Sequence, residues 1–184
     1  MAYQVDDSLV SVDEYLEMEE RSEIRHEYVG GVLYAMGGGS DHHNRIAGNI
    51  YISFSMKARE SGCRVYIADM RFQIDDVYYY PDVMVACEPP ETENPVWRTN
   101  PCVVVEVLSP STETIDRREK LLAYRSVASV QTYLIVHQDT QRVERYYRNE
   151  SGQWARADHV RDGYIPIPCL ETRLTLAEIY QGLT

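Results

Sequence analysis

The sequence predicts an α/β or α+β protein with a mixed central β-sheet flanked by helices, and three observations predict this class. The chain of 184 residues has the length of one compact domain. Two nearly continuous apolar runs, at residues 102–108 and 131–136, are typical of strands buried on both faces. Segments with helical periodicity precede and separate these runs. We therefore expect residues 1–184 to form a single domain.

The first elements are expected to be a helix and a hairpin. Ser11 and Glu14 have the spacing of a capping box, so a short helix is expected to end near Glu20. Two β-prone segments then flank Gly30 and Gly31, and both glycines accept the positive φ that a tight turn requires.

A longer helix of about 18 residues is expected next, capped by Asp41 and ended by Gly62. After it come three β-rich segments, at residues 64–68, 71–74 and 77–86. Four prolines then make residues 88–101 a loop.

The second half of the chain is predicted to centre on the run at residues 102–108, a strand buried on both faces. Residues 109–125 are expected to form a helix that covers it. The run at 131–136 is a second buried strand, with residues 142–147 as its hairpin partner. A short helix at about residues 176–180 ends the pattern.

The charge balance limits the partners of this protein. Eighteen basic and 29 acidic residues give a formal net charge of −11, which repels polyanions at long range. Tight nonspecific binding of nucleic acid is therefore disfavoured. Any chemistry on nucleic acid has to depend on a local basic patch and on metal ions.

The cysteines and the N-terminus give expectations about the compartment. Cys63, Cys87, Cys102 and Cys169 show no C-x-x-C spacing, so neither a zinc knuckle nor a disulfide framework is predicted, and four reduced thiols are expected.

The chain lacks a signal-peptide pattern and a run of about 18 apolar residues. We expect a cytoplasmic protein without a membrane partner.

Glu106 is the strongest anomaly, because it lies inside an apolar run with valine on either side. A buried carboxylate costs free energy unless a positive group meets it. Its partner is either an arginine, such as Arg71 or Arg118, or a metal ion.

Asp82 favours the metal. If the strand that contains Asp82 pairs with the strand of Glu106 in antiparallel fashion, so that Cys87 lies near Cys102, the two carboxylates become neighbours. Two carboxylates that stay ionised side by side need a cation between them. Oxygen ligands favour magnesium or manganese over zinc. By itself, Asp82 is equally well explained as a turn residue after Pro81.

The order Pro81-Asp82, then Glu106 in an apolar strand, resembles the PD-(D/E)xK nuclease motif. The whole chain resembles the Uma family of predicted restriction endonucleases. The stretches that carry this resemblance are residues 27–32, His42, 80–85, 104–112, 116–120 and Tyr124. The resemblance implies a restriction-endonuclease-like fold, and a magnesium or manganese ion bound by Asp82, Glu106 and Val107. It further implies a homodimer that acts on DNA.

One departure from the superfamily pattern concerns the catalytic lysine. The position two residues after Glu106, where that lysine would stand, holds Leu108. The resemblance implies that Lys120, on the following helix, takes its place and that Glu27 completes the site. Alternatively, Lys120 and Asp116 form an ordinary exposed helix pair, because they lie four residues apart.

Two other groups of side chains have open interpretations. His42 and His43 at a helix start are more often solvated than functional. The tyrosines at residues 78–80 either offer a stacking surface for bases or belong to the core.

Three functions are compatible with this pattern. The leading one is metal-dependent hydrolysis of phosphodiester bonds in DNA, with Asp82, Glu106, Lys120 and Glu27 as the catalytic residues. The alternative is a catalytically inactive, nuclease-like scaffold that binds nucleic acid or a protein partner, which Leu108 and the negative charge favour. The third is hydrolysis of a smaller phosphoester.

Overall fold

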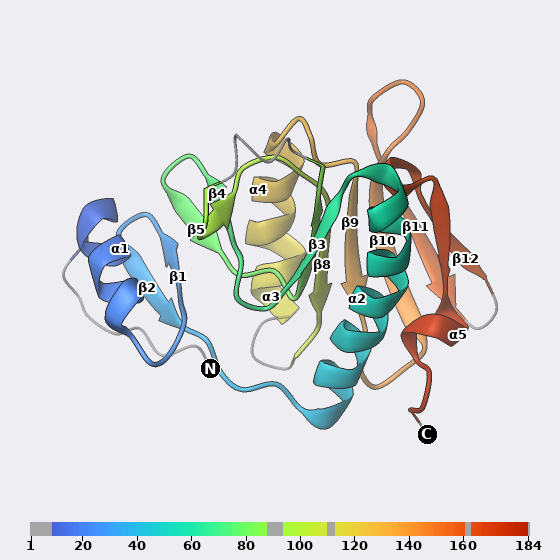
Figure 1. The fold of residues 1–184 in the computed structure, drawn as a ribbon, viewed down its shortest axis with the longest axis horizontal. Coiled ribbons are helices and arrows are strands. Elements are labelled where there is room, and N and C mark those ends of the chain that lie inside the picture. The colour runs from blue at the N-terminus through green and yellow to red at the C-terminus, as the bar shows by residue number, and fades with distance from the viewer. Residues whose placement is uncertain (1–8, 88–93, 110–112, 161–162, 184) are drawn as a thin grey trace.

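A computed structural model describes residues 9–87, 94–109, 113–160 and 163–183, and its centre is a mixed six-stranded sheet (Figure 1). The strand order is β11-β10-β9-β8-β6-β3. The pair β8–β9 is parallel, and the neighbouring pairs are antiparallel. The bounds are β3 (Arg64–Ile67), β6 (Val83–Ala86), β8 (Pro101–Val107), β9 (Thr132–Val136), β10 (Arg142–Arg148) and β11 (Trp154–Val160). The predicted α+β class with a mixed central sheet is confirmed.

Two smaller sheets lie at opposite ends of the molecule (Figure 1). One has five strands in the order β2-β1-β5-β4-β7, and the other pairs β12 with β13. The bounds are β1 (His26–Val29), β2 (Val32–Ala35), β4 (Arg71–Ile74), β5 (Val77–Tyr79), β7 (Trp97–Arg98), β12 (Tyr164–Ile167) and β13 (Thr172–Thr175). The hairpin β1–β2 turns at Gly30 and Gly31, whose φ angles are 57° and 88°. The hairpin prediction is therefore confirmed.

The first two helices begin and end close to the capping and stop residues predicted from the sequence, with one correction. In helix α1 (Val12–Arg21), the capping box between Ser11 and Glu14 is formed. Helix α2 (Asp41–Ser61) has 21 residues and ends at Gly62 in the left-handed conformation. Its cap is Ser40, which accepts from the His43 backbone N–H, so the prediction that Asp41 caps this helix is wrong. Serine and aspartate cap equally well, so residue type alone could not choose between adjacent positions.

The helix expected at residues 109–125 is divided. It consists of α3 (Glu113–Ile115), a π-helical segment (Asp116–Lys120) and α4 (Leu121–Ser126), while residues 110–112 lie outside the described part of the chain. A short α5 (Leu176–Ile179) and a 3-10 turn (Pro168–Leu170) lie near the C-terminus. Among the helices of the described ranges, none has the length and apolar character needed to cross a membrane.

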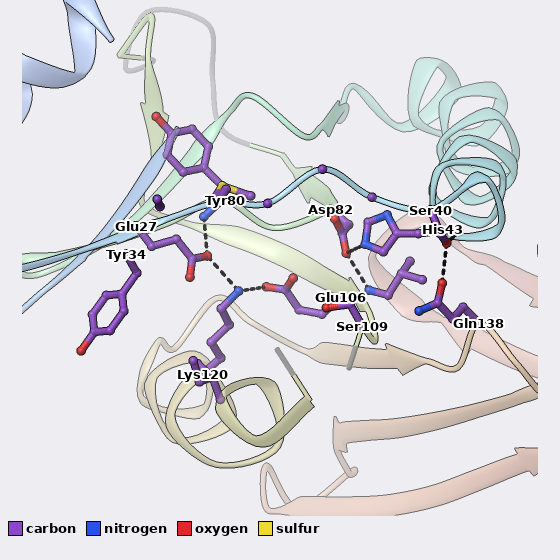
Figure 2. A pocket seen from close by; sticks show the side chains of 17 residues that line it. Glu27, Tyr34, Ser40, His43, Tyr80, Asp82, Glu106, Ser109, Lys120 and Gln138 are labelled. Carbon is purple, nitrogen blue, oxygen red and sulfur yellow. Dashed lines mark hydrogen bonds and ion pairs between the residues drawn. The ribbon is translucent and has the colours of Figure 1, made fainter. Parts of the chain in front are cut away.

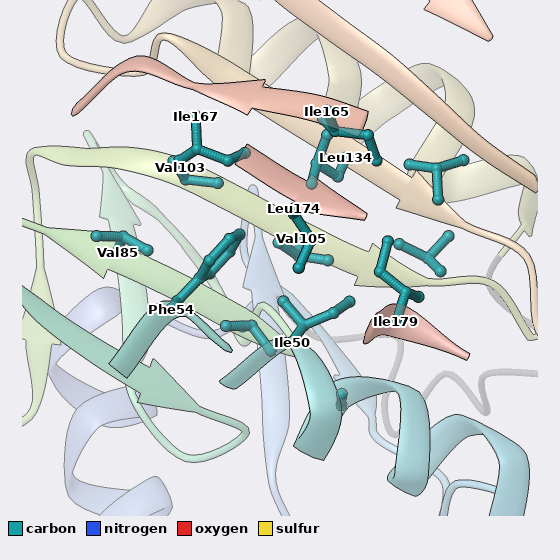
Figure 3. Packing of buried hydrophobic residues seen from close by; sticks show 14 of the residues in the cluster. Ile50, Phe54, Val85, Val103, Val105, Leu134, Ile165, Ile167, Leu174 and Ile179 are labelled. Atoms are coloured by element: carbon teal, nitrogen blue, oxygen red, sulfur yellow. The ribbon is translucent and has the colours of Figure 1, made fainter. Parts of the chain in front are cut away.

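The central sheet is covered on both faces, and strand β8 shows how. Val103, Val105 and Val107 pack in the cluster formed with α2 and the C-terminal elements (Figure 3). Val104 and Leu108, which alternate with them, pack against α4 in a second cluster. Because side chains alternate between the faces of a strand, Glu106 must point toward the α4 side.

The segment at residues 77–86 is two strands rather than one. It leaves the small sheet after Tyr79 and joins the central sheet at Val83, so residues 80–82 cross between the sheets. A proline cannot donate a ladder hydrogen bond, and Pro81 lies at this crossing. All three tyrosines at residues 78–80 are buried, so the proposed base-stacking surface is wrong.

The cysteines form two disulfides, Cys63–Cys87 and Cys102–Cys169, so the expectation of four reduced thiols is wrong. The paired residues are separated by 24 and 67 positions in the sequence. Spacing rules detect only cysteines that are close in sequence, whereas these meet through the topology of the sheet.

The α2 side of the core can be tested with Phe54, which is 1% exposed and packs against the central sheet (Figure 3). Replacing it with alanine is expected to lower the free energy of unfolding by about 3–5 kcal/mol, through lost burial and a cavity. Met56 is on the same helix but 69% exposed, so Met56→Ala should change stability by less than about 0.5 kcal/mol. Urea denaturation followed by circular dichroism measures both. Equal effects would contradict the described packing of α2.

Candidate functional site

A cavity of about 340 Å³ opens between the two larger sheets and brings together side chains that are distant in sequence (Figure 2). Its polar lining comes from β1, the start of α2, the start of β6, the end of β8 and the π-helical segment. The titratable residues in this lining, with tyrosines set aside, are Glu27, His43, Asp82, Glu106 and Lys120. All four predicted catalytic residues therefore line one cavity.

The neighbourhood of Asp82 and Glu106 follows from strand pairing. Strands β6 and β8 are antiparallel, with Val83 opposite Val105, so the next pair outward is Asp82 and Glu106. The expected pairing of these two strands is therefore found. Met84 packs in the same cluster as Val104, so alternation directs both carboxylates to the α4 side of the sheet.

Lys120 is the cationic partner of Glu106. Its Nζ lies 2.8 Å from Glu27 Oε1, 3.1 Å from Glu106 Oε1 and 3.4 Å from Asp116 Oδ1 (Figure 2). Lys120 is 4% exposed and Asp116 is 1% exposed. The alternative of an exposed helix pair is therefore wrong, because a surface pair would be solvated. The partner of Glu106 is a lysine rather than Arg71 or Arg118.

The π-helical segment sets the position of this lysine. A π-helical turn is wider than an α-helical one and often marks a functional site. Lys120 ends the segment, and Tyr124 lies one turn further, so both side chains meet the same carboxylate. The Tyr124 hydroxyl donates to Glu106 Oε1 at 2.7 Å. Sequence reasoning assigned no role to Tyr124, although its spacing from Lys120 is a signal that could have suggested one.

Sequence reasoning also gave too little weight to a role for His43 in the site. Its Nε2 lies 3.2 Å from Asp82 Oδ2, and this contact raises the pKa of His43. His42 is exposed. Helix α2 therefore turns only one of the two histidines into the cavity. Gly39 leaves room for it, because a Cβ on Gly39 would lie 2.8 Å from His43 Nδ1.

Val107 contacts Asp82 through its backbone. Its N–H donates to Asp82 Oδ2 at 2.7 Å, so two groups, Val107 and His43, hold this carboxylate in place. Val107 also lines the cavity, while its side chain packs on the opposite face in the α2 cluster. Leu108 is buried in the α4 cluster, where an aliphatic side chain stabilises the core.

The electrostatics of the cavity are dominated by negative charge. Burial, and then the nearby Asp116, Asp82 and Glu27, raise the pKa of Glu106 well above its usual range, against the opposing effect of Lys120. Burial disfavours the ammonium of Lys120, but Glu106, Glu27 and Asp116 raise its pKa well above the ordinary value. Lys120 therefore stays protonated, and this one ammonium contacts the three carboxylates of Glu27, Glu106 and Asp116.

These donors fit a hard divalent cation. Asp82 and Glu106 are adjacent carboxylates whose local charge exceeds what Lys120 neutralises, and magnesium and manganese prefer oxygen ligands. Lys120, Tyr124, His43 and the Val107 N–H each engage one oxygen of these two carboxylates. The pair is therefore held in a defined orientation before any ligand arrives.

Comparisons with known proteins bear on the fold and the family of this chain. The fold resembles that of an Anabaena variabilis protein described as "a putative nuclease belonging to DUF820", whose crystal structure matches with a TM-score of 0.77 and 18% sequence identity. That match covers 93% of this chain and 97% of the other. Two uncharacterised proteins of Synechocystis sp. are similar in sequence. One, slr1290, is 35% identical over 95% of this chain and 93% of its own, and the other, sll1609, is 33% identical over 79% and 85%.

The fold is thus that of a nuclease-like α+β protein. The Uma2 family model, described as "Putative restriction endonuclease", matches residues 12–177. The chain belongs to the Uma2 family, and the family resemblance noted in the sequence is confirmed.

The burial of Lys120 gives a prediction about stability. Lys120→Ala leaves the buried Glu106 and Asp116 without their cation, so the free energy of unfolding should fall by about 3–5 kcal/mol. Lys57, the only other lysine in the sequence, forms an exposed pair with Glu60. Lys57→Ala should therefore cost well under about 1 kcal/mol. Urea denaturation of the two variants gives the comparison.

A double variant tests whether the cost arises from the ion pair. Adding Glu106→Gln to Lys120→Ala removes the orphaned charge, so the two effects should be strongly non-additive. Additive costs would mean that Lys120 stabilises the fold by packing rather than by pairing with Glu106.

Proposed function

We propose that this protein is a magnesium- or manganese-dependent endonuclease of the PD-(D/E)xK type that hydrolyses phosphodiester bonds in DNA. One observation carries the proposal: Glu27, Asp82, Glu106 and Lys120, from four separate segments of the chain, line one cavity. An ordinary buried ion pair needs two partners, whereas this cluster has an excess of carboxylates. Family membership and the nuclease-like fold support nuclease-like chemistry. The metal is inferred from the donor set, and DNA from the resemblance to restriction endonucleases.

In this proposal Asp82 and Glu106 hold the cation, together with the backbone of Val107. The bound cation would act as a Lewis acid that polarises the phosphate and lowers the pKa of a water molecule. The orientation of these two carboxylates comes from side chains and backbone groups of the chain itself. Val107 N–H and His43 orient Asp82, and Tyr124 orients Glu106.

Lys120 has the second role in this proposal. Its ammonium lies against Glu106 and Glu27, where a protonated group orients the attacking water and offsets charge on the phosphate in the transition state. Glu27 Oε1 also accepts from the Tyr80 N–H at 3.1 Å. This contact fixes Glu27 at the crossing between the sheets, where it can accept a proton from the water.

The alternative function also has a specific observation in its favour. Lys120 contacts three carboxylates, and the formal net charge of the chain is −11, so the cavity does not attract a phosphate by itself. A nuclease-like scaffold that binds a partner without cleaving DNA is consistent with these facts. A homodimer with two sites related by a twofold axis, and a cytoplasmic location, stay predictions.

Cleavage of DNA separates these functions. Supercoiled plasmid incubated with the protein and manganese should be nicked or linearised, and EDTA should abolish the reaction. Glu106→Gln keeps the shape of the side chain but removes a ligand charge, so the rate should fall at least about a hundredfold. Glu60→Gln, on an exposed residue of α2, is the control and should retain wild-type activity. Binding of DNA without cleavage by the folded wild-type protein would favour the scaffold.

Metal binding can be measured without cleavage. Manganese at ten times its Kd should stabilise the protein by about 1.4 kcal/mol, which corresponds to a rise in Tm of roughly 3–6 °C. Asp82→Asn should remove most of this rise, while Asp41→Asn on the exposed start of α2 should leave it intact. Differential scanning fluorimetry provides the measurement. A Tm that manganese leaves unchanged in the wild type would contradict the metal site.

A further inference from the structure

A second cluster of potential metal ligands lies away from the carboxylate cavity. It contains every cysteine of the chain: Cys63, Cys87, Cys102 and Cys169. Cys102 precedes Glu106 by four positions in β8, so the two sites are separated by about 13 Å along the strand. The cluster is therefore a distinct site at the opposite end of the same strands.

The four cysteines come from four different segments. Cys63 follows the end of α2, Cys87 follows β6, Cys102 lies in β8, and Cys169 lies in the 3-10 turn Pro168–Leu170. The Cα atoms are 4.1 Å apart in the pair Cys63–Cys87 and 6.4 Å apart in the pair Cys102–Cys169. The backbone thus brings the four side chains together without any local sequence motif.

The two disulfides also touch each other. Cys87 Sγ lies 3.7 Å from Cys102 Sγ, across the two pairs, and the sulfurs of Cys87, Cys102 and Cys169 all lie within 4.8 Å of one another. Each disulfide joins two cysteines only, so disulfide formation does not require the two bonds to lie next to each other. Four thiolates around zinc at Zn–S distances of about 2.3 Å would be separated by about 3.8 Å at the edges of the tetrahedron. The contact between the pairs already has this spacing.

We propose that the reduced protein binds one zinc ion through these four cysteines, and that the two disulfides are the oxidised, metal-free form of the same site. A dithiol reductant supplies two electrons and two protons to each disulfide and is itself oxidised to a disulfide. The four thiols formed then lose four protons as their sulfurs bind Zn²⁺. Thiolates are the ligands that zinc prefers in structural sites.

The elements around the four cysteines suit a structural zinc ion that fixes the C-terminal elements to the central sheet. Cys169 lies between β12 and β13, which with α5 cover the α2 face of the central sheet. Cys87 is exposed, so a metal can reach the cluster from solvent. A zinc ion bound by the four thiolates would connect these C-terminal elements to β8 and to the end of α2, as the disulfides do in the oxidised form. The inference is independent of the proposed nuclease activity.

The test uses the full chain, fully reduced with a phosphine, freed of metal, and titrated with Co²⁺ and then Zn²⁺ under anaerobic conditions. We expect one Co²⁺ per chain at the cysteines, counted by the thiolate charge-transfer absorption and the visible bands of a tetrahedral complex, and its displacement by one Zn²⁺. The disulfide form should bind neither ion at this site. Zinc should also protect all four cysteines of the wild type from alkylation, as read by mass spectrometry.

Two variants assign the ligands. Cys87→Ser, at the most exposed cysteine, and Cys169→Ser should each weaken zinc binding by more than about a hundredfold. Glu106→Gln is the matched control, because it changes the carboxylate cavity and should leave the cobalt spectrum unchanged. Circular dichroism establishes that each variant is folded. If either serine variant does not fold, the alkylation and cobalt measurements on the wild type decide the question.

The proposal is overturned if the folded, reduced wild type binds no cobalt or zinc, or if its cysteines are alkylated equally fast with and without zinc. A cobalt spectrum that Cys87→Ser and Cys169→Ser leave unchanged would also overturn it. Cobalt that binds without thiolate bands, and that Glu106→Gln alone releases, would place the metal in the carboxylate cavity instead.

Discussion

The candidate site depends on a single ammonium group buried among carboxylates. Lys120 Nζ contacts Glu27, Glu106 and Asp116, which come from three different elements. Isolated charges are excluded from protein interiors by the cost of desolvation. Lys120 can stay buried only because these carboxylates surround it, and they require it in turn. The position of the π-helical segment against the sheet is therefore fixed by electrostatics as well as by packing.

This mutual dependence allows Lys120 two roles. A lysine that orients a water and a lysine that neutralises buried carboxylates occupy the same place and make the same contacts. The two roles differ in the net charge of the cluster, that is, in how many carboxylates stay without a cationic partner. Asp82 adds a further carboxylate beside Glu106, and the group that pairs with it is His43. Four carboxylates, those of Glu27, Asp82, Glu106 and Asp116, then share one lysine and one histidine. That imbalance distinguishes a site prepared for a cation from a self-sufficient ion-pair network.

Most of the site could be predicted from the sequence, for reasons that are physical. Glu106 stood out because a carboxylate inside an apolar strand is costly, and Asp82 because one loop connects its strand to that of Glu106. Lys120 and Glu27 followed from family resemblance, since no local pattern links residues 27 and 120. The orientation of His43 was beyond prediction, because it depends on how the start of α2 turns toward β6.

The errors have a common origin. Ser40 and Asp41 are both good caps, and a continuous β-prone run at residues 77–86 hides the change of sheet at Pro81. The cysteines were judged by their spacing, yet they meet through strand order and the C-terminal turn. In each case local preference was compatible with several structures, and tertiary contacts selected one of them.

The crossing at residues 80–82 has a consequence for the geometry of the site. The small sheet carries Glu27, the central sheet carries Glu106, and Asp82 lies at the end of the crossing between them. The Tyr80 N–H, in the same crossing, donates to Glu27. The chain also passes between the two sheets from β3 to β4 and from β7 to β8. Several short connections therefore hold Glu27 opposite Glu106, and the shape of the cavity depends on how the two sheets are joined rather than on either sheet alone.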